Sequence, residues 1–523
     1  MVKSKAKSKD IILFTLSIIF LILPIFTFIF SNIMFKSNYL DYEVIFNSDK
    51  LNLKHSKISG KIHVDNNWTA IKAMGICTGN GTYFEPYLIE NLEIDAKNSG
   101  SCIIIENSNL YFRIVNCTLS NSAGSANGGI KLNNVTHSQL IENICFSNWC
   151  GIRLQNSAIN IISDNIVNDN NFGIDLMNSN NNTVSGNILN RGDNGIDLSC
   201  SNNNSISGNT LNNNDFRGIN LFDCNNNIVS GNIVNNVWFG IWIVGFNNYV
   251  KENILNFCFL GIHLYNNRNC TLSGNIMNEC GLEISGNLEM LSSLNIDTTN
   301  LVNDKPLYYY LNKVNLGLHN FTNAGQVFLI NCNNSLISNV DTSKCYKGIS
   351  LRYSYNNTIT ANIANHNSCG LYLFNSDYNN ISGNNLNLCI NGIRLSNSDY
   401  NNISGNSANN STDNGYGIGL YYCNSNTISG NTANHNAYGI FLLGSDNNNV
   451  SGNVLLENDE CIIEFNCQGN KFSDNGSCTY GQGQDPIPEN LIFGYNLFFF
   501  VSILLILIII LSKQQRIQNR NHF

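Results

Sequence analysis

One column of residues combines side chains that could do chemistry with a regular spacing. Each is the third residue of a Gly-Ile-x-Leu tetrapeptide or a close variant, and between Gly173 and Gly281 these tetrapeptides recur every 20 to 23 residues. If the tetrapeptides are equivalent strands with Ile and Leu pointing inward, the third side chains point outward, one above another. The column contains Asp175, Asp197, Asn220, Trp242, His263 and Glu283.

Two carboxylates and one indole decide which chemistry this column could support. Asp175 and Asp197 should lie about 5 Å apart on successive strands, and like charges at that distance raise the pKa of one carboxyl. Such a pair could supply the acid and the nucleophile of glycoside cleavage. It could also accept hydrogen bonds from sugar hydroxyls while Trp242 stacks on a sugar ring. We favour binding over catalysis, and a solvated face that binds nothing is the third possibility.

Motifs of other enzymes and of metal sites are absent from the sequence. There is no Gly-x-Ser-x-Gly elbow, no phosphate-binding loop and no His-Glu-x-x-His pair. His366 and His435 occupy the same place in their repeats, but three repeats separate them, or about 14 Å. They cannot share a metal ion. We therefore predict no metal and no cofactor, and no catalytic residue can be assigned.

The cysteines and the charges exclude further classes of partner. The 18 cysteines contain no Cys-x-x-Cys pair, which argues against zinc. Cys200 and Cys224 indicate a ladder of buried thiols rather than a disulfide bridge, whereas Cys467 and Cys478 could pin a terminal coil. Only 12% of residues are charged and the net charge is -8, so nucleic acid is not an expected partner.

A repeat of 22 or 23 residues must position the outward column. Ser-Gly-Asn recurs at Asn187, Asn209 and Asn232, in constant phase with the Gly-Ile-x-Leu tetrapeptides. Each unit holds three short alternating runs separated by Asn, Ser and Gly, which tolerate the left-handed backbone of a sharp corner. This pattern predicts an all-β fold, a right-handed parallel β-helix solenoid of about 22-residue coils. We expect the recurrent Asn residues to point inward as a hydrogen-bonded ladder.

The gap between Gly281 and Gly348 is 67 residues, close to three periods. Both markers return at Gly325–Ile330, one period before Gly348. We therefore expect the solenoid to run through the gap, with a degenerate coil and a protruding loop suggested by Pro306, by Tyr308–Tyr310 and by residues 315–320. Before the array, residues 67–74 should form a short helix, because an open β-helix end needs a cap.

Two apolar runs near the ends predict membrane spans. The first, Ile11–Phe30, follows four lysines and is long enough to cross a bilayer; we favour an uncleaved signal anchor over a cleaved signal peptide. The second, Leu497–Leu511, precedes Lys513, Arg516 and Arg520. Basic residues that flank a membrane span usually lie on the cytoplasmic side, so both termini should be cytoplasmic and the array between the spans should lie on the extracytoplasmic side of the cell membrane.

These observations divide the chain into seven segments. They are a cytoplasmic basic tail (1–10), a signal anchor or signal peptide (11–35), an N-terminal cap with the first strands (36–99), the parallel β-helix (100–480), a linker (481–490), a transmembrane helix (491–512) and a second cytoplasmic basic tail (513–523).

The coils with Gly-Ile-x-Leu and Asn-Asn-x-Ile-Ser-Gly-Asn resemble the repeat of pectate-lyase-like proteins, a carbohydrate-binding and sugar-hydrolase group. They most closely resemble the NosD-like proteins, over roughly residues 78–480. The resemblance implies a right-handed coil. The group includes polysaccharide lyases, hydrolases, epimerases and a periplasmic accessory protein of copper-enzyme maturation. No catalytic motif of any member matches residue by residue, so none is carried over.

The sequence thus predicts a membrane-anchored, extracytoplasmic β-helix that binds a surface or extracellular glycan, either a polysaccharide or a glycoprotein glycan. The candidate ligand-binding residues are those of the outward column, from Asp175 to Glu283. A polysaccharide-processing hydrolase, lyase or epimerase is the first alternative. A structural or adhesive stalk and an accessory protein of copper-enzyme maturation are the others.

Overall fold

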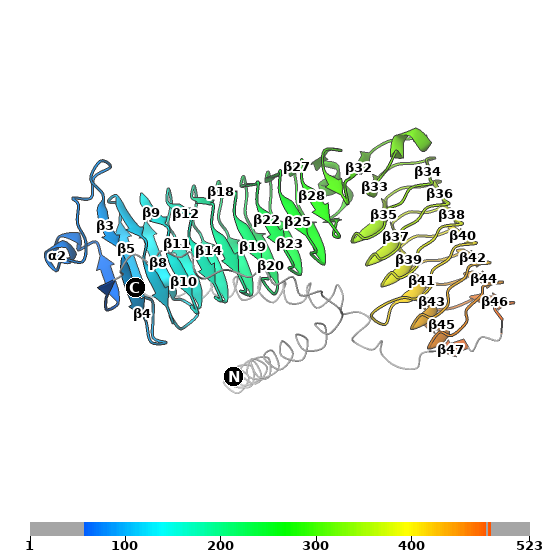
Figure 1. Cartoon of the computed structure of the whole chain (residues 1–523). Helices are drawn as coiled ribbons and strands as arrows, with labels where there is room; N and C mark the ends of the chain where they lie inside the picture. Colours follow the sequence, from blue (N-terminus) through cyan, green and yellow to red (C-terminus); the bar gives the residue numbers. More distant parts are fainter. Residues whose placement is uncertain (1–56, 477–479, 483–523) are drawn as a thin grey trace, which may run out of the picture. The chain divides into compact units, whose positions relative to one another are not determined.

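A right-handed parallel β-helix fills the described part of the chain (Figure 1). The computed structural model describes residues 57–476 and 480–482. A typical coil contributes the strands β17 (Asn194–Ser199), β18 (Ser205–Ser207) and β19 (Thr210–Asn212). Each strand pairs in parallel with its counterpart one coil further on. The predicted fold class is confirmed for these residues.

The predicted membrane-spanning segments, 11–35 and 491–512, lie outside the described residues. Within residues 57–476 and 480–482, no helix combines the length and the apolar character needed to cross a bilayer.

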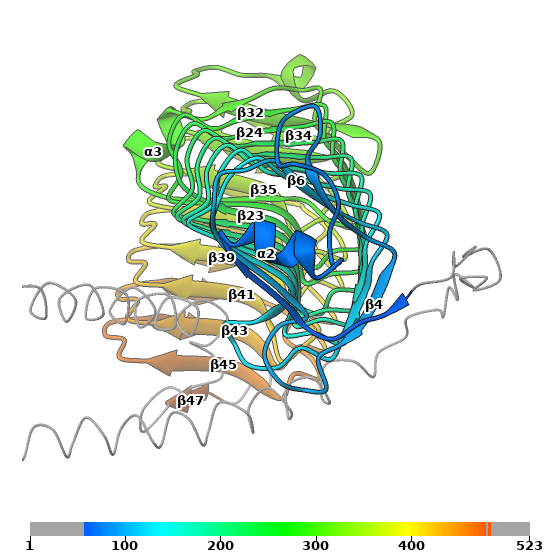
Figure 2. The ribbon, with the colours of Figure 1, turned by 90° about the vertical axis from the view of Figure 1, so that its left-hand side faces the viewer.

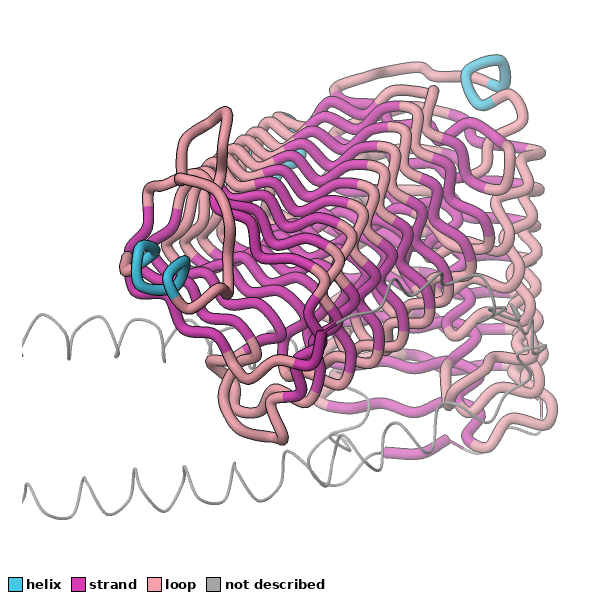
Figure 3. The backbone as a smooth tube through the Cα atoms, turned by 60° about the vertical axis from the view of Figure 1, so that its left-hand side comes forward, coloured by secondary structure: helices cyan, strands magenta, loops and turns pink. Residues whose placement is uncertain are grey.

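Alternation along the strands sorts side chains between core and surface. In the coil of β17–β19, Ile196, Leu198, Ile206 and Leu211 are fully buried. Burial of such aliphatic side chains stabilises the fold by about 1.5–3 kcal/mol each. Figure 3 shows the result of repeating this pattern, with strands and corners aligned in rows along the solenoid.

Glycine is the second residue of most long strands, such as β11 (Cys150–Gln155), β14 (Phe172–Met177) and β17, because two coils approach closely there. A Cβ atom added at Gly173 would lie 2.5 Å from the carbonyl oxygen of Gly195 and 2.6 Å from a methyl carbon of Leu189. Glycine is required at position 208 for a different reason. Gly208 lies at a corner and has a φ of +64°, which glycine adopts without steric cost.

Buried asparagines form a ladder parallel to the solenoid axis, as predicted. The side-chain Nδ2 of Asn209 donates to Oδ1 of Asn232 at 2.9 Å and to the Val184 carbonyl at 3.0 Å. Its Oδ1 accepts from the backbone nitrogen and the Nδ2 of Asn187. A second ladder follows another corner, through Asn182, Asn204, Asn227 and Asn248. Both ladders are fully or almost fully buried.

A third ladder explains several cysteines. Ser179 and Ser201 point inward at one corner, and the backbone nitrogen of Ser201 donates to the sulfur of Cys224 at 3.3 Å. Cys224 therefore replaces an inward serine and keeps a free thiol, so no bridge joins it to Cys200. The suggested terminal bridge through Cys467 is wrong, because that thiol is free while Cys461 is disulfide-bonded.

The N-terminal end carries the predicted cap. Helix α2 (Trp68–Ala73) lies across the opening of the first coils (Figure 2), with Trp68 and Ile71 buried. The Trp68 ring stacks on Tyr87 at a centroid distance of 4.7 Å, and its Nε1 donates to the Ser108 hydroxyl. The side chain of Asn67 does not cap the helix; it accepts from the backbone nitrogen of Asp65.

The long strands fall into two stacks. The first stack contains β2 (Ile62–Asp65), β5 (Ile103–Ser108), β8 (Gly128–Val135), β11 (Cys150–Gln155), β14 (Phe172–Met177), β17, β20 (Arg217–Phe222), β23 (Phe239–Val244), β26 (Leu260–Tyr265) and β29 (Leu282–Ser285). The second contains β32 (Lys305–Leu311), β33 (Gln326–Ile330), β35 (Lys347–Arg352), β37 (Cys369–Phe374), β39 (Asn391–Ser396), β41 (Tyr416–Tyr421), β43 (Tyr438–Leu443), β45 (Glu460–Phe465) and β47 (Tyr480–Gln482).

The solenoid does not run unbroken from one stack to the other, contrary to the sequence-based expectation. After α3 (Leu288–Ser292) and β30 (Asn295–Ile296), strand β31 (Leu301–Val302) pairs antiparallel with β32 (Lys305–Leu311), and β32 begins the second stack. Of the segment expected to protrude as a loop, Tyr308–Tyr310 lie within β32 instead, whereas residues 315–320 lie outside the strands. A 3-10 helix, η2 (Leu318–Phe321), follows. The core correspondingly divides into two clusters.

One glutamine side chain closes the edge of the first stack. Oε1 of Gln326 accepts from the backbone nitrogen of Leu282 at 2.9 Å, while its Nε2 donates to the carbonyls of Leu282 and Lys347, both at 2.8 Å. The amide of Gln326 thus takes the place of a peptide group of the missing neighbouring strand.

We expect Asn209→Leu to lower the free energy of unfolding by about 1–3 kcal/mol, because it leaves buried donors and acceptors on neighbouring coils unsatisfied. The control is Asn449→Leu, at an exposed strand position of β44 (Asn449–Ser451), where a change of under about 0.5 kcal/mol is expected. Urea denaturation of both variants measures the difference. Equal destabilisation would contradict the role of the ladder.

Candidate functional site

The predicted outward column exists as a register of paired strands. Asp175 pairs with Arg153 on one side and with Asp197 on the other. Asn220, Trp242, His263 and Glu283 continue the same register. The six predicted residues are all buried, with exposed fractions between 1% and 9%. We call Arg153 and these six residues the polar column.

The two aspartates of the polar column have protein partners. Nη1 of Arg153 lies 3.3 Å from Oδ2 of Asp175 and donates to the Ser125 carbonyl at 2.6 Å. Oδ2 of Asp197 accepts from the Asn220 amide at 2.9 Å. Each carboxylate is therefore already held by a neighbouring coil.

Burial dominates the electrostatics of this pair. The pKa of Asp175 is raised to about 7, mainly by burial and next by the neighbouring carboxylate of Asp197, while Arg153 opposes both effects. Burial also raises the pKa of Asp197, against Arg217 and Asn220. The ion pair with Arg153 would by itself lower the pKa of Asp175, but desolvation and the second carboxylate outweigh it.

Trp242 packs against a cation and aromatic rings. The guanidinium of Arg217 lies 3.9 Å from the Trp242 ring centroid and 4.4 Å from that of Phe216. The Phe239 ring lies at 5.2 Å and the His263 ring at 5.8 Å from the indole. The indole face predicted to stack on a sugar thus contacts the side chain of Arg217.

The end of the polar column belongs to the junction between the stacks. Oε1 of Glu283 accepts from Nζ of Lys347 at 2.7 Å and from Nη2 of Arg352 at 3.0 Å. Burial lowers the pKa of His263 to about 4, and the three neighbouring cations support the neutral ring against the effect of Glu283. The sequence could not place Lys347 and Arg352 here, because they lie 64 and 69 residues from Glu283.

A second surface, which the sequence analysis missed, lies at one corner of the second stack. Tyr353 and Tyr422 follow long strands, and Tyr378 and Tyr400 lie at the other bend of the same corner. All four have left-handed backbones, with φ between +55° and +59°. Together with Tyr355, Asp377 and Asp399 they form what we call the tyrosine corner.

Three rings of the tyrosine corner are largely exposed, while those of Tyr353 and Tyr355 are half-buried. Tyr378, Tyr400 and Tyr422 are 54–60% exposed. Tyr378 and Tyr400 stack with a centroid distance of 5.0 Å and an interplanar angle of 4°. The ring of Tyr422 lies beside Gly444, where a Cβ atom would come within 2.8 Å of it.

Polar groups line a hollow beside these rings. It has a volume of about 320 Å³ and is lined by Tyr353, Tyr355, Asn375, Asp377 and Asn397. Asp377 uses Oδ1 to accept from the backbone nitrogen of Asp399 at 2.8 Å. The hollow therefore presents amide and carboxylate groups next to aromatic faces, a combination suited to a hydroxyl-rich ligand.

The signal for this corner was present in the sequence. The first stack has Asn181, Asn203 and Asn226 at the bend where the second has Tyr378 and Tyr400. Asparagine adopts the left-handed region readily and tyrosine does not. Tyrosines at the asparagine positions of a repeat were therefore the clue.

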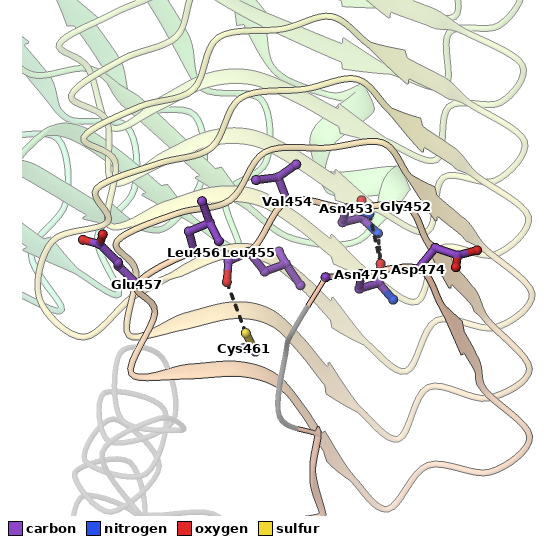
Figure 4. Close-up of a pocket in the computed structure, with 10 residues that line it drawn as sticks. Gly452, Asn453, Val454, Leu455, Leu456, Glu457, Cys461, Asp474 and Asn475 are labelled. Carbon is purple, nitrogen blue, oxygen red and sulfur yellow. Dashed lines mark hydrogen bonds between the residues drawn. The ribbon is translucent and has the colours of Figure 1, made fainter.

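A further hollow, of about 370 Å³, lies at the C-terminal end of the second stack (Figure 4). Its wall includes Leu455, Leu456 and the hydrogen-bonded asparagines Asn453 and Asn475. The sulfur of Cys461 faces the Leu455 carbonyl there. This hollow is the end of the core beneath the last coils, and we assign no ligand to it.

Fold and repeat together define a parallel β-helix protein with 22-residue coils. The chain belongs to the family described as periplasmic copper-binding protein (NosD), whose model matches residues 87–249 and 284–484. A search of curated proteins finds no match.

Solved structures similar to this chain include three proteins that differ widely in sequence. An alginate lyase from Paenibacillus is 10% identical, with 46% of this chain and 97% of that chain covered and a TM-score of 0.35. A tailspike protein of E. coli bacteriophage HK620 in complex with a pentasaccharide is 12% identical, with 66% and 72% covered and a TM-score of 0.32. The A-module of a mannuronan C-5 epimerase from Azotobacter vinelandii is 11% identical, with 75% and 92% covered and a TM-score of 0.26.

The described residues do not fit a copper site. Copper takes sulfur and imidazole ligands, and in the described ranges no three His, Cys, Asp or Glu side chains come together in a way that could hold a metal. Cys224 and Cys280 are buried, and burial raises their thiol pKa, which disfavours the thiolate that a metal requires.

The raised pKa of Asp175 predicts a pH dependence of stability. Below about pH 4 this carboxyl is protonated in both the folded and the unfolded state, so it carries no charge to bury. As the pH rises towards about 7, only the unfolded chain gains by ionising, and the stabilising contribution of the folded carboxyl is lost. Asparagine cannot titrate. The melting temperature of Asp175→Asn relative to wild type should therefore rise between pH 4.5 and pH 8.

Asp223→Asn is the control, because Asp223 is an exposed corner residue of the first stack. Its melting-temperature difference from wild type should change little over the same range. A constant difference for Asp175→Asn would show that the buried carboxyl does not hold the extra proton.

Proposed function

We propose that this chain binds a polysaccharide outside the cytoplasm and that the tyrosine corner is its main contact surface. The observation that carries the proposal is the set of four tyrosines in left-handed backbone on four successive coils. That conformation costs roughly 1–2 kcal/mol for a residue other than glycine or asparagine. The exposed rings of Tyr378, Tyr400 and Tyr422 bury too little surface to repay this cost through folding, whereas the Tyr353 ring is half-buried against the core.

The surroundings of the rings support a sugar as the ligand. Flat aromatic faces stack on the C–H faces of pyranose rings, and the neighbouring Asp377, Asn375 and Asn397 offer partners for hydroxyls. Other corner residues, such as Ile159, Phe257 and Leu388, also have positive φ, but no two of these large apolar residues are neighbours in one column. Only repetition along the axis makes an extended contact surface for a polymer.

The polar column from Asp175 to Glu283 stays a prediction as a second ligand surface. Its aspartates are held by Arg153 and Asn220, so a ligand would have to displace protein hydrogen bonds. A polysaccharide-processing activity is the second candidate function, because the pKa of Asp175, at about 7, lies in the range that a general acid needs.

Export and anchoring form part of the same proposal. The family description includes the word periplasmic, and the two apolar runs have basic flanks. We propose a cell-membrane protein whose β-helix lies on the extracytoplasmic side, with both termini inside.

Replacing Tyr378 and Tyr400 together by asparagine tests the binding surface. Loss of the stacked pair lowers the free energy of unfolding by about 0.5–1.5 kcal/mol. Asparagine adopts the left-handed backbone at lower cost than tyrosine, so the two substitutions also raise the free energy of unfolding by about as much or more. Stability should therefore change little, whereas binding in a glycan-array screen and in calorimetry should weaken at least tenfold. Tyr249→Asn, at a 51% exposed position of the short strand β24 (Tyr249–Lys251), should keep wild-type affinity.

The same assay separates the two surfaces. If Trp242→Ala or the double change Asp175→Asn and Asp197→Asn abolishes binding in a folded protein while the tyrosine variant keeps full affinity, the ligand binds at the polar column. If no polysaccharide of the array binds the wild-type protein, the stalk alternative replaces the proposal.

Protease added to intact cells tests the topology. It should remove most of the mass of the chain, because the β-helix lies outside, and should leave tags at both termini protected. Digestion of the C-terminal tag from outside would contradict the second span. Loss of the N-terminal tag before any protease is added would indicate a cleaved signal peptide.

A further inference from the structure

We infer that the ligand of the tyrosine corner is a linear polysaccharide without acidic groups, lying along the solenoid axis. The inference rests on the proposed function and names the chemistry and the direction of its ligand. It follows from two features of the corner, the negative charge of its aspartates and the register of its rings.

The charge comes from aspartates that share one column. Asp377, Asp399 and Asp446 each accept the backbone nitrogen of the next coil with Oδ1, at 2.8, 2.6 and 2.7 Å. In the described ranges, none of the three forms an ion pair, and no hydrogen bond to their Oδ2 atoms is seen. The second oxygen of each carboxylate is therefore available to accept from a ligand.

Among residues 57–476 and 480–482, no cationic side chain forms an ion pair with this column. Arg352 precedes Tyr353 in the chain, but it is 5% exposed and bound to Glu283. A polymer of uronic acids would bring its own carboxylates to within one coil spacing, about 4.8 Å, of Asp377 and Asp399. Like charges at that distance repel, whereas hydroxyl groups donate to the same oxygens.

The direction comes from the register of the corner. The backbone nitrogen of Tyr378 donates to the Asp399 carbonyl, and that of Tyr400 to the Asn424 carbonyl, so the corner residues of successive coils lie side by side. Tyr353, Tyr378, Tyr400 and Tyr422 fall on four successive coils and span about 14 Å along the axis. A chain running across the axis would meet one coil only, while a chain along the axis meets all four.

The outer faces of the stacked pair extend this path. The column of Tyr378 and Tyr400 continues with Asn356 on one side and Ser425 on the other. Both side chains are shorter than tyrosine, so each ring keeps one face that its neighbour in the stack does not cover. A linear polymer can use these faces and the hollow at Asp377 together.

Calorimetry on the full-length protein in detergent or nanodiscs tests both parts of the inference. The probes are uncharged β-linked gluco-oligosaccharides and chito-oligosaccharides of two to eight units, and oligogalacturonates of the same lengths. We expect the affinity for one uncharged series to rise at least tenfold between two units and the length that covers four coils, and then to level off. Oligogalacturonates should bind at least tenfold more weakly than this series. The difference in affinity should shrink at high salt, because salt screens the repulsion.

The double change Asp377→Asn and Asp399→Asn should reduce the discrimination against oligogalacturonate, because it removes the repelling charges. The matched control, Asp164→Asn with Asp223→Asn, removes two exposed charges from first-stack corners with left-handed backbone and should leave discrimination unchanged. Preferred binding of oligogalacturonate, or an affinity independent of length, overturns the inference while leaving polysaccharide binding intact. Absence of binding to every probe and to a wider glycan array overturns the proposed function itself.

Discussion

The buried asparagine ladder is the interaction on which the rest of the structure depends. A corner of a β-helix turns the backbone away from the sheets, so its peptide groups lose their partners inside the core. Each ladder asparagine binds a backbone nitrogen of one coil and an amide of the next, as Asn209 does between Asn187 and Asn232. Because an unsatisfied buried group costs about 1–3 kcal/mol, a shift of register along the stack is strongly disfavoured.

Fixed register turns single residues into columns. Side chains at the same place in successive coils form a column, and neighbouring members of the column lie about 4.8 Å apart along the axis. Where the column faces neighbouring side chains, charges pair with one another, as Asp175 does with Arg153. Where the column lies at an exposed corner, the side chains are left to solvent or to a ligand. The polar column is of the first kind, and the tyrosine corner is of the second.

Periodicity made the coil, the corners and the inward asparagines predictable, because each depends only on residues 22 or so apart. The partners of Glu283 were not predictable, since Lys347 and Arg352 reach it across the break in the stack. The break itself was hidden because the markers resume in phase at Gly325, although β31 and β32 run antiparallel between them. The residues of the polar column were placed in the correct register, but their burial depends on side chains such as Arg217, which the repeat does not specify.

The junction shows how a stack can end without exposing its edge. Gln326 supplies a donor and an acceptor to the last long strand of the first stack, and Glu283 binds two cations from the second. Burying one anion with two cations gives little net stability, but it leaves few alternative ways to join the two stacks. The long strands of the second stack then continue the sheet of β28 (Ile276–Asn278) and β31 rather than that of β29. The corner that follows them therefore begins a new row, in which tyrosines can stand where the first stack has asparagines.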